Sequence, residues 1–178
     1  MLINGCGHLD VVILLLLKSF FPLLILLLCL LIENIQLPPG YREDDLEDLP
    51  DQGKRRGPNR YFAHIRAQKQ WKQAVQGYLA SIYFADTMLG HVLDALKKGP
   101  NAKDTIVVLW SDHGWHLGDM GIWGNATNYE IAARVPLIIS APDIGRHGSR
   151  CNRPASLIDL SPPLLDLCDL PPVQDLAG

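Results

Sequence analysis

A short, almost continuous apolar run followed at once by polar residues lies in the middle of this sequence. Residues 105–110 read Thr-Ile-Val-Val-Leu-Trp, and Ser-Asp-His-Gly follows. Such a run is typical of a strand buried on both faces of a mainly parallel sheet. Asp112 and His113 would then lie at the carboxyl end of a central strand, the edge where open α/β sheets bind ligands. Gly114 would let the chain turn sharply there.

Asp112 and His113 offer donor atoms to a cation. Carboxylate oxygens and imidazole nitrogens both bind metals, but calcium takes about six to eight donors, mostly oxygen. The remaining ligands would therefore have to come from elsewhere in the fold or from substrate. In the competing interpretation, Asp112 caps a turn and His113 is an ordinary surface histidine. The residue types alone leave this choice open.

Further motifs surround this pair of residues. They are Leu-Trp-Ser-Asp-His-Gly-Trp-His-Leu-Gly-Asp at 109–119, Trp123, Ala-Thr-Asn-Tyr-Glu at 126–130, Arg-Val-Pro-Leu-Ile-Ile at 134–139, Gln-Leu-Pro-Pro-Gly at 36–40 and Ser-Leu-Ile-Asp at 156–159. Together they resemble the sulfatase family of the alkaline phosphatase superfamily, and within it the iduronate-2-sulfatase-like branch. The resemblance implies an α/β fold with helices flanking a mainly parallel sheet, and hydrolysis of sulfuric esters.

The resemblance also implies a site. Sulfatases use calcium and a formylglycine made from Cys or Ser in a Cys/Ser-x-Pro-x-Arg motif, and the formylglycine hydrate attacks sulfur. Asp112 and His113 match two of the calcium ligands. His116 could reach the mouth of the cleft, and Asn125 stands where the family commonly has a lysine that contacts the sulfate group. An amide can donate a hydrogen bond there but lacks the positive charge.

The nucleophile motif and the family's paired metal-binding aspartates are missing. Cys6 and Cys29 have the wrong context, and in Cys151-Asn-Arg-Pro the proline comes one position too late. We therefore expect a partial sulfatase-type domain at 35–178, with a partial calcium site, no formylglycine and no activity alone. Two alternatives stay open. One is a catalytically dead, membrane-tethered remnant or interaction module, and the other is a phosphoester or phosphonate hydrolase of the same superfamily.

The first 34 residues form an apolar amino-terminal segment. Residues 11–32 are apolar apart from Lys18, Ser19 and Pro22, and a helix of that length, at about 1.5 Å per residue, would span a bilayer core of about 30 Å. We therefore predict an apolar helix, as a transmembrane helix or signal anchor, and a membrane-associated, periplasmic or extracellular location. Residues 1–10 contain no Lys or Arg, unlike a signal peptide. The alternative is foreign sequence joined to the domain by a gene-model artefact.

Composition limits the partners. The formal net charge is −3, with no overall basic bias, so no nucleic-acid partner is predicted. The partner implied by the resemblance is a sulfated small molecule or glycan.

The remaining elements follow from periodicity and turn residues. Apolar residues spaced four and three apart predict one long amphipathic helix over about 67–98. A second buried strand is predicted at 135–140, and a short helix at 157–170 interrupted early by two prolines. The acidic segment within 36–60 reads as an extended, solvated surface segment.

Overall fold

A computed structural model of the chain describes residues 32–173 except 56, 143 and 145–147. The apolar helix predicted over 11–32 lies outside the described residues, except for Ile32, which begins the 3-10 helix η1 (Ile32–Asn34). Among the residues that are described, no helix is both long enough and apolar enough to cross a membrane.

The chain divides into two compact units, which we name after their strands. The β1–β4 unit contains residues 93–112 and 136–173, and the β2–β3 unit contains residues 32–92 and 113–135. The boundary crosses α4 (Trp71–Lys98), whose residues up to Val92 belong to the β2–β3 unit.

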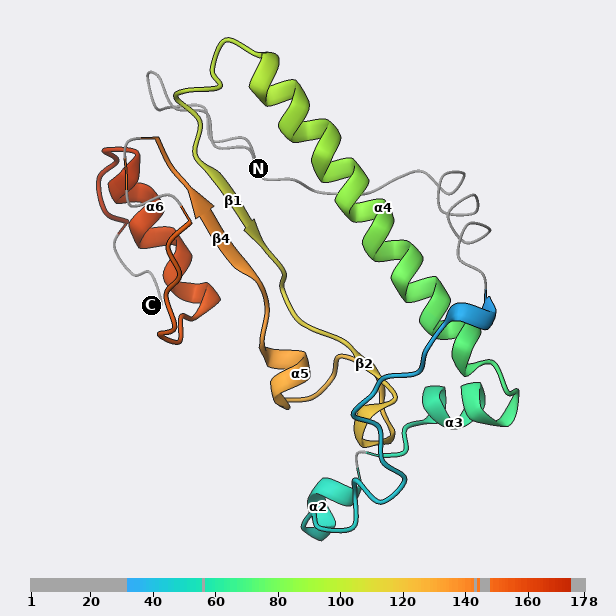
Figure 1. Cartoon of the computed structure of the whole chain (residues 1–178). Helices are drawn as coiled ribbons and strands as arrows, with labels where there is room; N and C mark the ends of the chain where they lie inside the picture. The colour runs from blue at the N-terminus through green and yellow to red at the C-terminus, as the bar shows by residue number, and fades with distance from the viewer. Residues whose placement is uncertain (1–31, 56, 143, 145–147, 174–178) are drawn as a thin grey trace. The chain divides into compact units, whose positions relative to one another are not determined.

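Two short antiparallel strands form the sheet of the β1–β4 unit. They are β1 (Val107–Trp110) and β4 (Leu137–Ser140), which lie side by side (Figure 1). The prediction of a mainly parallel sheet is wrong for the described residues, because both strand pairs there are antiparallel. An apolar run predicts that a strand is buried but not which way its neighbour runs. Three of the four residues of β4 are in fact exposed.

The other elements of this unit broadly follow the predicted pattern. Thr105 and Ile106 are buried just before β1, and the Thr105 hydroxyl donates to the carbonyl oxygen of Asn101 at 2.7 Å. The helical segment predicted at 157–170 consists of η3 (Leu157–Leu160) and α6 (Ser161–Leu167). The two prolines lie in the first turn of α6, where a missing backbone N–H is tolerated. They therefore begin the helix and do not interrupt it.

The long helix predicted over about 67–98 is present as one helix that begins four residues later than predicted, and a separate helix precedes it. α3 (Arg60–Ala67) ends before Lys69, and α4 (Trp71–Lys98) begins after it. Lys69 has a φ of +55°, a left-handed conformation that a right-handed helix cannot contain. The predicted end at Lys98 is confirmed. Short helices α2 (Asp51–Lys54), η2 (Asp119–Gly121) and α5 (Glu130–Ala133) complete the β2–β3 unit.

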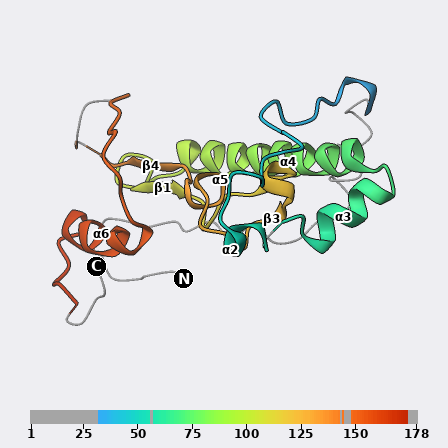
Figure 2. The same ribbon diagram turned by 90° about the horizontal axis from the view of Figure 1, so that it is seen from below.

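The hairpin of this unit is formed by β2 (His116–Leu117) and β3 (Trp123–Gly124). Its register places His116 opposite Gly124. α3 lies at the amino-terminal end of α4 in both ribbon views (Figure 1 and Figure 2), and the hairpin is bonded to Trp71, the first residue of α4. α3 contacts β3 directly.

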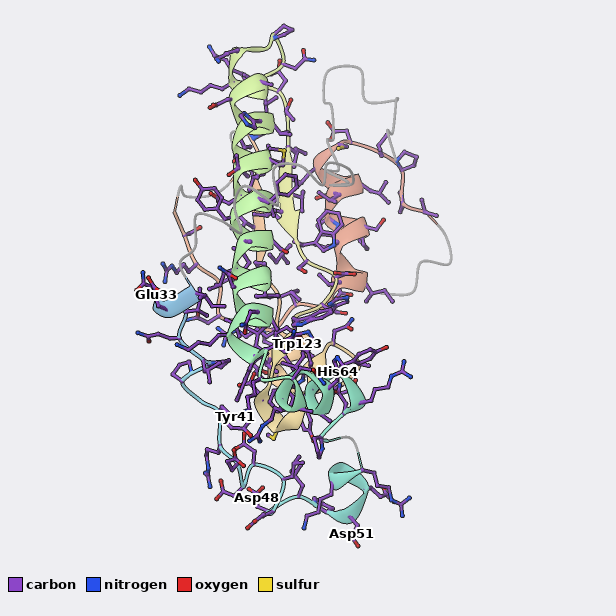
Figure 3. The ribbon with its side chains drawn as sticks, turned by 90° about the vertical axis from the view of Figure 1, so that its right-hand side faces the viewer. Glu33, Tyr41, Asp48, Asp51, His64 and Trp123 are labelled. Atoms are coloured by element: carbon purple, nitrogen blue, oxygen red, sulfur yellow. The ribbon has the colours of Figure 1, made fainter. Side chains whose placement is uncertain are left out.

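The acidic segment is on the surface, as predicted. Asp44, Asp48 and Asp51 are exposed. Figure 3 shows Asp48 and Asp51 on an outlying part of the β2–β3 unit, away from Trp123. The Asp44 carboxylate instead pairs with the Arg42 guanidinium at 2.8 Å.

Candidate functional site

The tight turn of the β2–β3 hairpin requires glycine. The Gly118 N–H donates to the carbonyl oxygen of Ile122 at 2.9 Å and closes the turn. Gly118 has a φ of +125°, and a Cβ there would lie 2.8 Å from Cε2 of Phe62. Both the backbone conformation and the close approach of the α3 side chain therefore exclude a larger residue.

Asn59 fastens β3 to the start of α3. Its Oδ1 accepts from the N–H of Phe62 at 2.9 Å, which caps α3, and from the N–H of Trp123 at 3.3 Å. Its Nδ2 donates to the carbonyl oxygen of Trp123 at 2.9 Å. The side-chain amide thus pairs with Trp123 as the peptide groups of a neighbouring strand would. This contact fixes β3 two residues before Asn125.

Trp71, the first residue of α4, fastens β2. Its indole Nε1 donates to the carbonyl oxygen of Leu117 at 2.7 Å. Its ring packs edge-to-face on Tyr41 and Phe62, with centroid separations of 4.6 and 4.9 Å. Phe62 is 1% exposed, so this aromatic cluster is the core that supports the hairpin.

His116 is buried at the start of β2, with an exposed fraction of 0%. Its Nε2 lies 2.8 Å from Oγ1 of Thr127, and its ring packs edge-to-face on Tyr129 at 5.9 Å. Its Nδ1 has no hydrogen-bond partner among the described residues. Burial lowers the pKa of His116 below its ordinary value of 6.5, against an opposing effect of Asp119. The imidazole is therefore neutral at pH 7, and its predicted contact with substrate stays a prediction.

Asn125 lies directly after β3 and is half-buried. Its backbone carbonyl accepts from the N–H of Thr127 at 2.7 Å. The Thr127 hydroxyl, which contacts His116, also accepts from the N–H of Tyr129 at 3.4 Å. The loop over 125–129 is thus held both by its own backbone and by a side chain of β2.

Asp112 and His113 follow β1, as predicted from the sequence. Asp112 is exposed and His113 is half-buried, and the boundary between the two units falls between them. Nδ1 of His113 lies 2.9 Å from the carbonyl oxygen of Gly114. When Nδ1 carries the proton and donates to this oxygen, the ring's lone pair is on Nε2, the nitrogen that would bind a cation. Their joint role as ligands stays a prediction.

Gly114 is required for a reason other than the predicted sharp turn. It does not adopt a positive φ. Its N–H donates to the carbonyl oxygen of Ala132 at 2.8 Å, and a Cβ at Gly114 would collide with the carbonyl oxygen of Ile131. The backbone of α5 therefore comes so close to the residue after His113 that only glycine fits.

The described residues do not complete a metal site. No three His, Cys, Asp or Glu side chains among them gather into a group that could hold an ion. Asp112 and His113 offer two donors of suitable type, whereas calcium takes about six to eight. A calcium site that includes this pair therefore stays a prediction.

Sequence reasoning missed two residues that support this region. An asparagine before the run Arg-Tyr-Phe-Ala-His-Ile is a common helix N-cap, so the capping role of Asn59 could have been predicted. Its contact with Trp123, 64 residues away, has no local signal. The same holds for Thr127, whose contact with His116 depends on the hairpin register.

Comparison with known proteins points to one family. The sulfatase family model matches residues 37–170. A sulfatase of Formosa agariphila is 40% identical over 144 residues, which cover 78% of this chain and 28% of that protein. Iduronate 2-sulfatase of Mus musculus is 46% identical over 67 residues, which cover 38% of this chain and 12% of that protein.

A solved structure agrees with the family match. The structure of BT4656 in complex with its substrate D-glucosamine-2-N,6-O-disulfate is similar with a TM-score of 0.58 and 31% identity, covering 61% of this chain and 22% of that one. The chain thus spans between about an eighth and just over a quarter of these relatives. The family match nevertheless covers most of the chain, including Asp112, His113 and Asn125. The chain belongs to the sulfatase family.

Proposed function

We propose that this chain contributes the Asp112–His113 part of a calcium site to a sulfuric ester hydrolase, and that it does not hydrolyse esters alone. The observation that carries the proposal is the family match over residues 37–170, which includes both residues. The second half of the proposal rests on the sequence, which contains no Cys/Ser-x-Pro-x-Arg motif. Without that nucleophile, the residues that remain can bind and orient a sulfate ester but cannot attack it.

The two proposed ligands have distinct roles. Asp112 would supply a carboxylate oxygen, and His113 would supply Nε2. A calcium ion held by these two side chains would polarise a sulfate oxygen and offset the negative charge that develops as the ester is cleaved. The hydrogen bond between Nδ1 of His113 and the carbonyl oxygen of Gly114, at 2.9 Å, would hold the imidazole in the tautomer that presents Nε2. The tight contact of Gly114 with α5 would keep that carbonyl in place.

Asn125 would donate a hydrogen bond from its side-chain amide to a sulfate oxygen. A neutral donor binds an anion less strongly than an ammonium group does, so we expect weak sulfate binding by this residue alone. Asn59 fixes the strand just before Asn125, and His116 fixes the loop just after it.

We infer a sulfated sugar as the substrate class. BT4656 was solved with its substrate D-glucosamine-2-N,6-O-disulfate, and a second relative is an iduronate 2-sulfatase. A sulfated sugar would offer a tetrahedral anion to calcium and to the Asn125 amide.

Titration of the full-length chain with calcium chloride in a calorimeter tests the proposal. We expect binding that is abolished by Asp112→Ala and unchanged by Asp94→Ala, a matched change at an exposed position on α4. Equal binding by the wild-type chain and Asp112→Ala would overturn the assignment of the site. Hydrolysis of 4-methylumbelliferyl sulfate by the purified chain would overturn its inactivity alone.

A second candidate function is an interaction module without catalysis. The observation that favours it is the exposed apolar surface of β4, where Ile138 and Ile139 are 58% and 43% exposed. Exposed apolar residues on adjacent positions of a strand are typical of a surface that another polypeptide covers. Absence of calcium binding by a folded chain would favour this candidate.

A further inference from the structure

We propose that His116 is a positioning residue for Asn125, acting through the hydroxyl of Thr127. The inference rests on the proposed function, because the position of Asn125 matters for activity only if its amide contacts the sulfate group.

The loop over residues 125–129 has hydrogen bonds within itself and a contact with β2. Within the described residues, the bonds from Thr127 N–H to Asn125 and from Tyr129 N–H to Thr127 join neighbouring loop residues. The contact of 2.8 Å between Nε2 of His116 and Oγ1 of Thr127 instead joins the loop to β2. The loop's internal bonds preserve its local shape, whereas the His116 contact sets where that shape lies relative to the hairpin.

The imidazole of His116 is buried although one of its nitrogens is unpaired. His116 is 0% exposed, and its Nδ1 has no hydrogen-bond partner among the described residues. Burying an unpaired ring nitrogen is unfavourable, so an apolar side chain of similar size would fill this space at lower cost. What histidine adds here is the bond from Nε2 to Thr127.

Asn125 lies between the residue opposite His116 and the residue that contacts His116. His116 stands opposite Gly124, the residue before Asn125. The carbonyl of Asn125 then accepts from the N–H of Thr127 at 2.7 Å. A displacement of Thr127 would therefore move the peptide group of Asn125 and with it the direction of its side chain. Asn59 restrains only the other flank, at Trp123.

Two variants of Thr127 test this role and leave the buried imidazole of His116 in place. Thr127→Val removes the hydroxyl at nearly constant volume, and Thr127→Ser keeps it. Amide hydrogen exchange is measured by NMR on the full-length chain in detergent micelles. We expect exchange at residues 125–129 to be about fivefold faster in Thr127→Val, mainly because the 2.8 Å bond with His116 is lost, since the contact with Tyr129 N–H that is lost with it is long, at 3.4 Å. Exchange in Thr127→Ser should equal that of the wild-type chain. Exchange within α3 and α4 should not change.

A titration with sodium sulfate, against sodium chloride at equal ionic strength, links the loop to binding. We expect the side-chain amide signals of Asn125 to shift, with an affinity about fivefold weaker in Thr127→Val and restored in Thr127→Ser. Unchanged loop exchange in Thr127→Val would overturn the positioning role. If the wild-type chain does not bind sulfate but Thr127→Val still loosens the loop, the positioning role is supported and the sulfate contact of the proposed function is overturned.

Discussion

Replacement of Asn59 should separate the capping of α3 from the anchoring of β3. The side chain accepts from Phe62 N–H at 2.9 Å, donates to the Trp123 carbonyl at 2.9 Å, and accepts from Trp123 N–H at 3.3 Å. Loss of an N-cap costs about 1 kcal/mol, and an ordinary hydrogen bond contributes about the same. Because the longest bond shares Oδ1 with the cap, Asn59→Ala should lower the free energy of unfolding by about 2 to 3 kcal/mol.

Two further variants separate the contribution of the α3 cap to the free energy of unfolding from that of the contact with Trp123. Asn59→Ser keeps an oxygen that can cap α3 but cannot reach Trp123 with both a donor and an acceptor, so it should cost about half as much as alanine. Asn59→Asp keeps Oδ1 but places a second oxygen against the Trp123 carbonyl. It should therefore be more destabilising than serine, because two acceptors face each other. Asn152→Ala, at an exposed position in the other unit, is the matched control.

The assay is urea unfolding of the full-length chain, followed by tryptophan fluorescence. Trp71 and Trp123 both lie in the unit that Asn59 supports, so the signal reports on the affected region. An Asn59→Ala variant within about 0.5 kcal/mol of the wild-type chain, the usual range for surface changes, would refute the reasoning. So would a serine variant as costly as the aspartate variant.

The other predictions concern the residues next to the proposed ligands. Gly114→Ala should destabilise the chain by about 1 to 3 kcal/mol in the same assay, because a Cβ there meets the backbone of α5. The control Gly90→Ala, in open space on α4, should instead stabilise the chain by about 0.5 to 1 kcal/mol. Equal changes in the free energy of unfolding for the two variants would contradict this reasoning. Because the pKa of His116 is lowered by folding, the unfolded chain binds the proton first, so stability should be complete above about pH 6.5 and fall below it. That slope, measured by thermal unfolding across pH 5 to 7, should be smaller in His116→Gln, and an identical slope would contradict it. Asn125→Lys should tighten sulfate binding about fivefold in the NMR titration because it adds a charge-assisted contact, and unchanged affinity would remove that role.

The positions of individual helices and strands were predicted better from the sequence than the way in which they pair. The carboxyl-terminal end of α4 lies at Lys98, where the apolar spacing predicted it, and the strand before Asp112 and His113 is present. The direction of β4 relative to β1 could not be read from an apolar run, since parallel and antiparallel strands share that pattern. The gap before α4 depends on the backbone conformation of a single lysine, to which apolar periodicity is not sensitive.

The candidate site shows the same division. Motif resemblance predicted the family, and Asp112, His113 and Asn125 lie in the matched region. The burial of His116 could not be predicted, because a histidine after a strand reads equally well as exposed or buried. The contact of Asn59 with Trp123 joins residues 64 positions apart, and no local pattern encodes it. Packing between distant segments therefore determines the parts of the site that the sequence does not reveal.

The most direct test of the central claim is NMR observation of the two proposed ligands during calcium addition. The full-length chain, labelled with ¹⁵N and ¹³C, is titrated with calcium chloride while Nε2 of His113 and the side-chain carboxyl carbon of Asp112 are followed. The account predicts that both signals shift together over the same calcium concentrations. Shifts confined to the exposed acidic residues between 44 and 51, with Asp112 and His113 unchanged at saturating calcium, would contradict it.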